Sequence, residues 1–119
     1  MAKIFGFSDA PHTKTIGRGT TYRFVDEDMG AKRIGVILVE LQPGMKSTEI
    51  HYHKEREGVY VVLQGNATLL LNGTEHQLKP ETVVYLSPGD KHGITSTGSE
   101  TFRMIEVYSP LGPDRVVVQ

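Results

Sequence analysis

The chain has 119 residues, with 13 basic and 14 acidic side chains, a formal charge of −1 and no cysteine. This length suits a single domain with one core, and the near-zero charge without a basic cluster gives no electrostatic basis for binding nucleic acid or an anionic membrane. The lack of cysteine excludes disulfides, thiolate metal sites and cysteine nucleophiles. The sequence also lacks a signal-type apolar segment and a long apolar span, which favours a soluble, cytoplasmic protein.

Short apolar runs separated by glycine and proline follow one another along the chain, and their β-branched content favours strands over helices. In chain order, the predicted strands are Tyr22 to Val25, Ile34 to Leu41, Val59 to Leu63, Ala67 to Leu71, Val83 to Leu86, Ile94 to Thr97 and Phe102 to Tyr108. Asn72-Gly73, which is followed by Thr74 to Leu78, predicts a type I′ hairpin turn, because both turn residues need positive φ. Many short strands with turns between them are typical of a small antiparallel sandwich or barrel.

The two ends of the chain differ from its middle. We interpret residues 1–119 as one domain with a core over about 33–108, an N-terminal arm over 1–20 and a C-terminal tail over 109–119. The last run, Arg115 to Val118, is apolar at a chain end, so it either pairs with another subunit or frays. Because the end runs offer strands for exchange, we expect a homodimer.

Two histidines one residue apart, His51 and His53, precede the predicted strand at Val59, and Glu57 follows them. On an extended segment, side chains at i and i+2 point to the same side, so both imidazoles lie on one face. A third histidine, His92, follows the turn residues Ser87-Pro88-Gly89-Asp90 at the start of a strand. Three imidazoles and one carboxylate fill part of an octahedral shell and leave positions for water, oxygen or a chelating substrate.

These segments resemble the two sequence motifs of the cupin superfamily. The first motif is matched in order by Gly44, His51, His53, Glu57 and Gly65, with two spacings each one residue longer than usual. In the second motif Gly89 and His92 match, whereas the usual Gly, Pro and Asn are replaced by Glu81, Ser87 and Ser96. The resemblance implies an all-β, antiparallel jelly-roll β-barrel in a small single-domain protein.

The extra residue between Glu57 and Gly65 leaves the carboxylate ligand open. Counted back from Gly65, the ligand position falls on Gly58, which has no side chain; counted forward from His53, it falls on Glu57. We favour Glu57, because a bulge at Gly58 absorbs one residue and restores the strand register. Glu55 has the parity of the histidines and is the alternative, and a three-histidine site remains if neither carboxylate binds.

The resemblance implies an enzyme that acts on a small oxygen-bearing metabolite by dioxygenase, isomerase or lyase chemistry. Its metal ligands would be His51, His53, Glu57 and His92, and its cofactor a divalent transition metal: Fe, Mn, Ni, Co, Cu or Zn. The alternative is a cupin module that binds a metabolite or metal without turnover. The barrel mouth is a possible position for Glu40, Tyr60, Arg103, Glu106 and Tyr108, none of which we assign as catalytic. We interpret His12 and His76 as structural.

Overall fold

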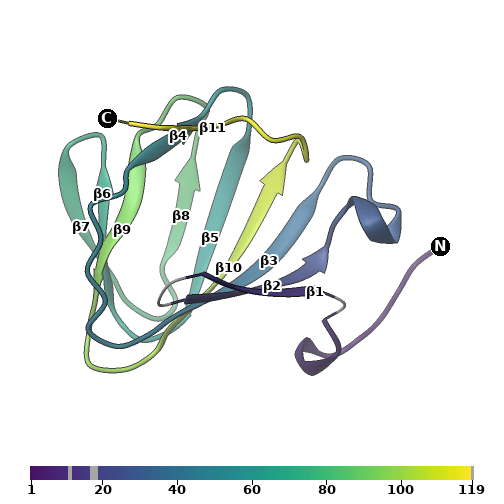
Figure 1. Ribbon diagram of the computed structural model, residues 1–119, viewed down its shortest axis with the longest axis horizontal. Coiled ribbons are helices and arrows are strands. Elements are labelled where there is room, and N and C mark those ends of the chain that lie inside the picture. The colour runs from purple at the N-terminus through teal and green to yellow at the C-terminus, as the bar shows by residue number, and fades with distance from the viewer. Residues whose placement is uncertain (11, 17–18, 119) are drawn as a thin grey trace.

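In a computed structural model, which describes residues 1–10, 12–16 and 19–118, the chain folds into two antiparallel β-sheets that face each other (Figure 1). The larger sheet has the strand order β1-β2-β3-β10-β5-β8, and the smaller sheet has the order β11-β4-β9-β6-β7. The larger sheet contains β1 (His12–Ile16), β2 (Gly19–Val25), β3 (Gly35–Leu41), β5 (Glu57–Gln64), β8 (Val83–Leu86) and β10 (Phe102–Ser109). The smaller sheet contains β4 (His51–His53), β6 (Ala67–Leu71), β7 (Thr74–Leu78), β9 (His92–Thr97) and β11 (Arg115–Val117). Short 3-10 turns occur at Phe7–Asp9 and Glu27–Met29. This architecture is the predicted antiparallel jelly-roll barrel.

Most strands form where the apolar runs predict them, whereas β1 lies in the segment that was expected to be an N-terminal arm. The strands β6 and β8 have the predicted bounds, and β5 is longer than its apolar run at both ends. The hairpin turn between β6 and β7 has φ values of 48° at Asn72 and 85° at Gly73, which confirms the two positive φ angles that the Asn-Gly pair requires.

The C-terminal run pairs within its own chain. Residues of β11 lie antiparallel to β4, with Arg115 opposite His53 and Val117 opposite His51. This pairing corrects the interpretation that the run pairs with another subunit or frays. The larger sheet also contains β1 and β2. Both strands come before residue 33, where the core was expected to begin.

The most deeply buried side chains lie between the sheets, toward one end of the barrel. Phe102, Leu69 and Val62 are fully buried, and burying an apolar side chain of this kind contributes about 1.5–3 kcal/mol. In the smaller sheet Leu69 faces Ile94, and the next inward pair along the same strands is Leu71 with His92. The core therefore fills one end of the barrel and leaves the end near His92 for other side chains.

One backbone position connects the fold to the cupin motif. Glu81, which stands where the second motif has glycine, has a φ of 71°. This left-handed backbone conformation is unfavourable for residues other than glycine, asparagine and aspartate. Glu81 therefore holds a backbone conformation that glycine adopts more readily.

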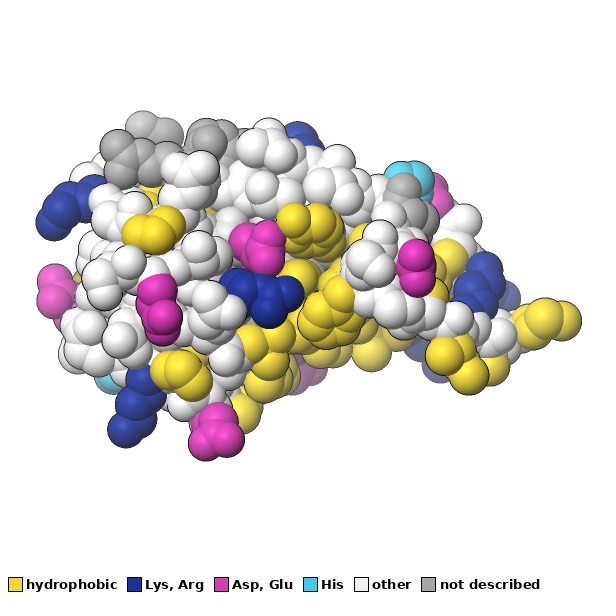
Figure 2. All heavy atoms as spheres, turned by 90° about the horizontal axis from the view of Figure 1, so that it is seen from below, with side chains coloured by type: hydrophobic (Ala, Val, Ile, Leu, Met, Phe, Trp, Pro, Cys, Tyr) yellow, Lys and Arg dark blue, Asp and Glu magenta, His cyan; other side chains and the backbone are white. Residues whose placement is uncertain are grey.

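The N-terminal end stands out from the barrel (Figures 1 and 2). Met1 and Ile4 are fully exposed there, while the Phe7 ring stacks on Phe24 with 4.6 Å between ring centroids. In Figure 2 acidic and basic side chains are interspersed over the visible face. Within the described part of the chain, no helix has the length and hydrophobicity needed to span a membrane.

Candidate metal centre and cavity

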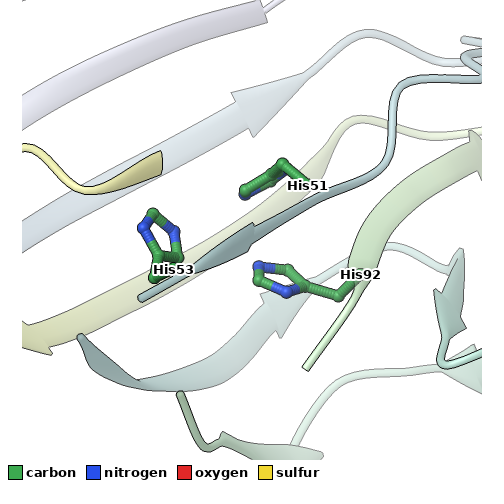
Figure 3. Close-up of side chains that lie close together, drawn as sticks. All are labelled: His51, His53 and His92. Atoms are coloured by element: carbon green, nitrogen blue, oxygen red, sulfur yellow. The ribbon is translucent and has the colours of Figure 1, made fainter. Parts of the chain in front are cut away.

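Adjacent strands bring the three motif histidines together. His51 and His53 are the first and last residues of β4, and His92 is the first residue of β9, directly opposite His51. Each of the three offers a ring nitrogen, and these nitrogens all lie within 4.8 Å of one another. The ring centroid of His51 is 4.3 Å from that of His92 and 5.3 Å from that of His53. Figure 3 shows the three side chains converging from β4 and β9 on one space.

Two of the three imidazoles are held by hydrogen bonds at Nδ1. Nδ1 of His53 lies 2.9 Å from Oδ1 of Asp114, and Nδ1 of His92 lies 2.8 Å from the carbonyl oxygen of Asp90. A carbonyl or carboxylate oxygen can only accept, so each Nδ1 carries a proton, and in the neutral form of each ring the lone pair is then on Nε2. This arrangement is the usual way in which proteins orient a histidine toward a metal.

The donor set fits a divalent metal. Burial lowers the pKa of His51 to about 4, with further contributions from the charges of His92 and His53. Burial also lowers the pKa of His92. Both imidazoles are therefore neutral at pH 7, as metal ligation requires. Nδ1 of His51 is buried and has no hydrogen-bond partner among the described residues, an unfavourable state for a polar atom that a cation held among the three rings would help to offset.

The structure does not bring Glu57 to the histidines. Along β5, Gly58, Tyr60 and Val62 are buried, whereas Glu57 is exposed. Its carboxylate accepts a hydrogen bond of 2.6 Å from the Tyr85 hydroxyl on the outer face of the sheet. The register shift between β5 and β10 lies beyond Val62, next to Gln64, so no bulge at Gly58 turns Glu57 inward.

Glu55, the alternative carboxylate, is an exposed residue between β4 and β5. Its backbone N–H donates to Asp114, and its side chain is not part of the histidine group. The carboxylate that does reach a site histidine is Asp114, which contacts the Nδ1 face of His53. Among the described residues the candidate group thus consists of the three histidines alone, which is the arrangement expected from the sequence if neither Glu57 nor Glu55 binds.

A cavity of about 500 Å³ opens beside the histidines between the two sheets. Its aliphatic and thioether walls are formed by Ile37, Val39, Leu41, Met45, Ile94 and Met104. Its polar lining includes His51, His53, Arg56, Tyr60, Glu106 and Tyr108. Along β10 the inward residues run from Tyr108 and Glu106 to Met104 and Phe102, so the cavity is polar at the histidine end and apolar toward the core.

Glu106 is an ionisable group of this cavity whose pKa departs from its ordinary value. It stands opposite Tyr60 of β5 and Ile37 of β3. Burial raises the pKa of Glu106 to about 7, although the charge of Arg56 opposes this shift. Burial, together with the charge of Glu106, also raises the pKa of Tyr60 well above its ordinary value. A carboxyl that titrates near neutral pH beside a protonated phenol is suited to acid-base chemistry.

The sequence contains a signal for Glu106, because it shares one face of its strand with the core residues Phe102 and Met104. A charged residue on a core-facing stripe is rare unless it has a function. Of the other possible mouth residues, Tyr60 and Tyr108 do line the cavity. Glu40 and Arg103 instead form an ion pair of 2.7 Å with each other and are not part of the cavity lining.

The remaining histidines lie elsewhere. His76 is exposed on β7. His12, on β1, lies 3.2 Å from the carboxylate of the exposed Asp28, with Asp26 nearby. Neither histidine approaches the group formed by His51, His53 and His92.

The buried position of Glu106 has a measurable consequence for folding of the metal-free protein. Its pKa is about 7 in the folded chain against an ordinary value of 4.5, so between these values the folded state holds a proton that the unfolded chain has lost. The free energy of unfolding should therefore fall as pH rises through this window, by about 3 kcal/mol from this group.

The substitution Glu106→Gln removes this titration. At pH 8 the variant should be more stable than the wild type by a similar amount, and at pH 4 the two should be nearly equal. Urea unfolding of both proteins at several pH values measures the difference. A stability difference that is the same at pH 4 and pH 8 would show that Glu106 does not titrate as the structure indicates.

One known family matches this chain. The family described as Cupin domain matches residues 37–108. The tetracenomycin polyketide synthase protein TcmJ of Streptomyces glaucescens is 30% identical over 112 residues, which are 94% of this chain and 74% of that protein. A glucose-6-phosphate isomerase of Pyrococcus abyssi is 38% identical over 68 residues, or 51% of this chain and 36% of the isomerase.

Solved structures show the same fold. The polyketide cyclase RemF of Streptomyces resistomycificus superimposes with a TM-score of 0.84 at 24% identity, covering all of this chain and 87% of that one. KdgF from Halomonas sp. superimposes with a TM-score of 0.75 at 16% identity, covering 92% of this chain and 94% of the other.

Proposed function

Because the chain belongs to the cupin domain family, we propose that its three-histidine site is a metal centre and that the protein is an enzyme acting on a small oxygen-bearing molecule. The reaction that we propose is removal of a proton from a carbon next to a carbonyl group. The observation that carries this proposal is that three imidazoles converge beside one cavity, which His51 and His53 line together with Glu106, a carboxyl with a pKa of about 7.

The metal would be held by His51, His53 and His92 in this proposal. Imidazole ligands without thiolate fit Fe, Mn, Co, Ni, Cu and Zn. When bound, such a metal supplies Lewis-acid polarisation of a carbonyl oxygen. Glu57 is not a ligand in this proposal, because its carboxylate accepts a hydrogen bond from Tyr85 on the outer face of the larger sheet.

Glu106 acts as the base in this proposal. As a carboxylate it accepts the proton from the carbon, and the electron pair of the broken C–H bond moves toward the carbonyl to give an enolate. Tyr60 keeps its proton at neutral pH because its pKa is raised, so it can donate a hydrogen bond to a substrate oxygen. Protonated Glu106 then returns the proton to carbon or to an oxygen, so protons and electrons balance.

The walls of the cavity favour an apolar substrate body. Cyclisation of a polyketone and interconversion of an aldose and a ketose both begin by breaking a C–H bond next to a carbonyl. The relative that is similar over most of its length is named as a polyketide synthase protein. The aliphatic stretch lined by Val39, Met104 and Ile94 suits an aromatic or polyketone body better than a sugar phosphate. We therefore propose a polyketone-type substrate.

The test is proton exchange in deuterium oxide. The chain is loaded with Zn²⁺, Mn²⁺ or Fe²⁺ and incubated with 2-acetonaphthone, a bicyclic methyl ketone, and NMR follows loss of the methyl proton signal. Loaded protein should accelerate exchange above both buffer with metal and metal-free protein. Glucose 6-phosphate, followed at C2, should exchange more slowly. Saturable binding of the ketone without acceleration would favour the alternative, a cupin module that binds without turnover.

We also propose a homodimer, formed through the outer face of the larger sheet. An apolar groove of about 270 Å³ on this face is lined by Ile34, Val59, Tyr85 and Val107, among others. Within this lining Tyr85 is 56% exposed, and Val83, two residues before it on β8, is 65% exposed. A contiguous exposed apolar surface of this kind is typical of a contact between proteins, and a second copy of the chain carries the same surface, as a two-fold dimer needs.

Light scattering after size exclusion should give twice the chain mass of 13.2 kDa. The substitution Val83→Asp should give the single-chain mass, because it places a charge in the contact, whereas His76→Asp on the smaller sheet should not change the mass. A wild-type protein that stays monomeric at high micromolar concentration would exclude this dimer.

A further inference from the structure

The C-terminal segment, residues 110–118, lies alongside the strand that carries two of the site histidines. Its strand β11 pairs with β4. The backbone N–H of Lys54 donates to the carbonyl of Asp114 at 3.3 Å, and that of Val118 donates to Ile50 at 2.8 Å. The segment therefore contacts both ends of β4.

Both carboxylate oxygens of Asp114 form hydrogen bonds with residues at or just after the end of β4. Oδ1 lies 2.9 Å from Nδ1 of His53, and Oδ2 accepts from the backbone N–H groups of Glu55 at 2.8 Å and Arg56 at 2.9 Å. The Asp114 side chain is only 14% exposed, so these bonds are partly shielded from water. A carboxylate with three such partners fixes both the ring of His53 and the turn that follows it.

Arg56 connects the same segment to the wall of the cavity. Its guanidinium donates to the carbonyl oxygens of Pro110, Leu111 and Gly112 at 3.1 to 3.3 Å. It also lies 4.1 Å from the centroid of the Tyr108 ring. The Tyr108 ring in turn occupies the space above Gly35, where a Cβ would overlap it. The segment thus holds one histidine and one aromatic wall of the cavity.

The three site histidines depend on this segment to different degrees. His92 is held by the carbonyl of Asp90, two residues away in its own turn. In the part of the chain that the structure describes, Nδ1 of His51 has no hydrogen-bond partner. Only His53, of these three, takes its orienting contact from the C-terminal segment.

We propose that Asp114 is a positioning residue for His53, and that docking of residues 110–118 on β4 is coupled to metal binding. The coupling to metal rests on the proposed function, whereas the positioning of the His53 ring does not. Because Asp114 holds the proton of His53 on Nδ1, it presents Nε2 as the ligand atom. Coupling of this kind is reciprocal: the docked segment raises metal affinity, and bound metal stabilises the docked segment by the same factor.

The first test is titration of the metal-free protein with Co²⁺, followed by its visible absorption. The substitution Asp114→Ala should weaken Co²⁺ binding by about 10–100-fold, the usual effect of losing such a partner. Asp114→Asn, which keeps an acceptor oxygen for His53, should recover part of the affinity. Glu55→Gln is the matched control, since it removes a negative charge from the same loop but its side chain makes none of the Asp114 contacts; it should bind as the wild type does.

The second test needs no metal. Nitrogen NMR of the metal-free wild type should show His53 with its proton on Nδ1, and Asp114→Ala should shift the population toward the Nε2 tautomer. Bound Co²⁺ should also slow hydrogen exchange at the amides of Lys54 and Val118. If the wild type binds no Co²⁺, the metal proposal fails while the tautomer still tests the role of Asp114. Equal Co²⁺ affinity and an unchanged tautomer in Asp114→Ala would overturn the inference.

Discussion

Replacing His51 and His53 together by alanine should remove tightly bound metal from the protein. Two of the three imidazoles that lie within 4.8 Å of one another are then lost, and a single imidazole from His92 cannot hold a divalent ion against dilution and buffer. Elemental analysis after expression in medium supplemented with Fe, Mn or Ni should give close to one metal per wild-type chain and almost none for the double variant.

The double variant should still fold. The histidine end of the barrel is separate from the buried side chains Phe102, Leu69 and Val62, and the substitution removes a buried nitrogen without a partner. Its far-ultraviolet circular dichroism should therefore match that of the wild type without metal. His76→Ala, at an exposed position of β7, is the control and should keep its metal. Undiminished metal in the folded double variant would place the ion elsewhere.

Replacing Glu106 by glutamine should slow ketone proton exchange by about 10²–10⁴-fold, the usual contribution of a positioned base. Glutamine has nearly the same shape and cannot accept the proton. The metal content should not change, because Glu106 does not belong to the histidine group. The assay is the 2-acetonaphthone exchange measured on loaded wild type and loaded variant.

The pH profile adds a second readout. A base must be ionised to act, so the rate of wild-type exchange should rise with pH and level off above the pKa of Glu106. This pKa is about 7 in the metal-free protein, and a bound cation lowers it. This rise should be absent from the variant. Glu57→Gln, on the outer face of β5, is the control for loss of a negative charge. A variant with wild-type exchange rates would exclude Glu106 as the base.

Local patterns were sufficient for most of the strands and for the pair His51 and His53. The turn at Asn72-Gly73 and the alternation of β10 depend on neighbouring residues, and the i, i+2 rule places His51 and His53 on one face whatever the rest of the chain does. The convergence of His92 required the resemblance to a known motif, because the pairing of β4 with β9 joins residues about forty positions apart.

The carboxylate could not be chosen from sequence because a shift of one residue reverses the face of a strand. A bulge before Gly58 would turn Glu57 inward, and the register shift instead lies near Gln64. The role of Asp114 could not be predicted from the sequence for a similar reason. It depends on where the C-terminal run docks, and an apolar run at a chain end carries no local sign of its partner strand.

The most direct test of the metal centre is a crystal structure of protein from metal-supplemented cells, with anomalous scattering measured at the absorption edge of the ion. The account predicts one ion bonded to ring nitrogens of His51, His53 and His92, with the Glu57 side chain on the outer face. An ion bound only elsewhere, for example between His12 and Asp28, or no ion in protein from supplemented cells, would contradict it.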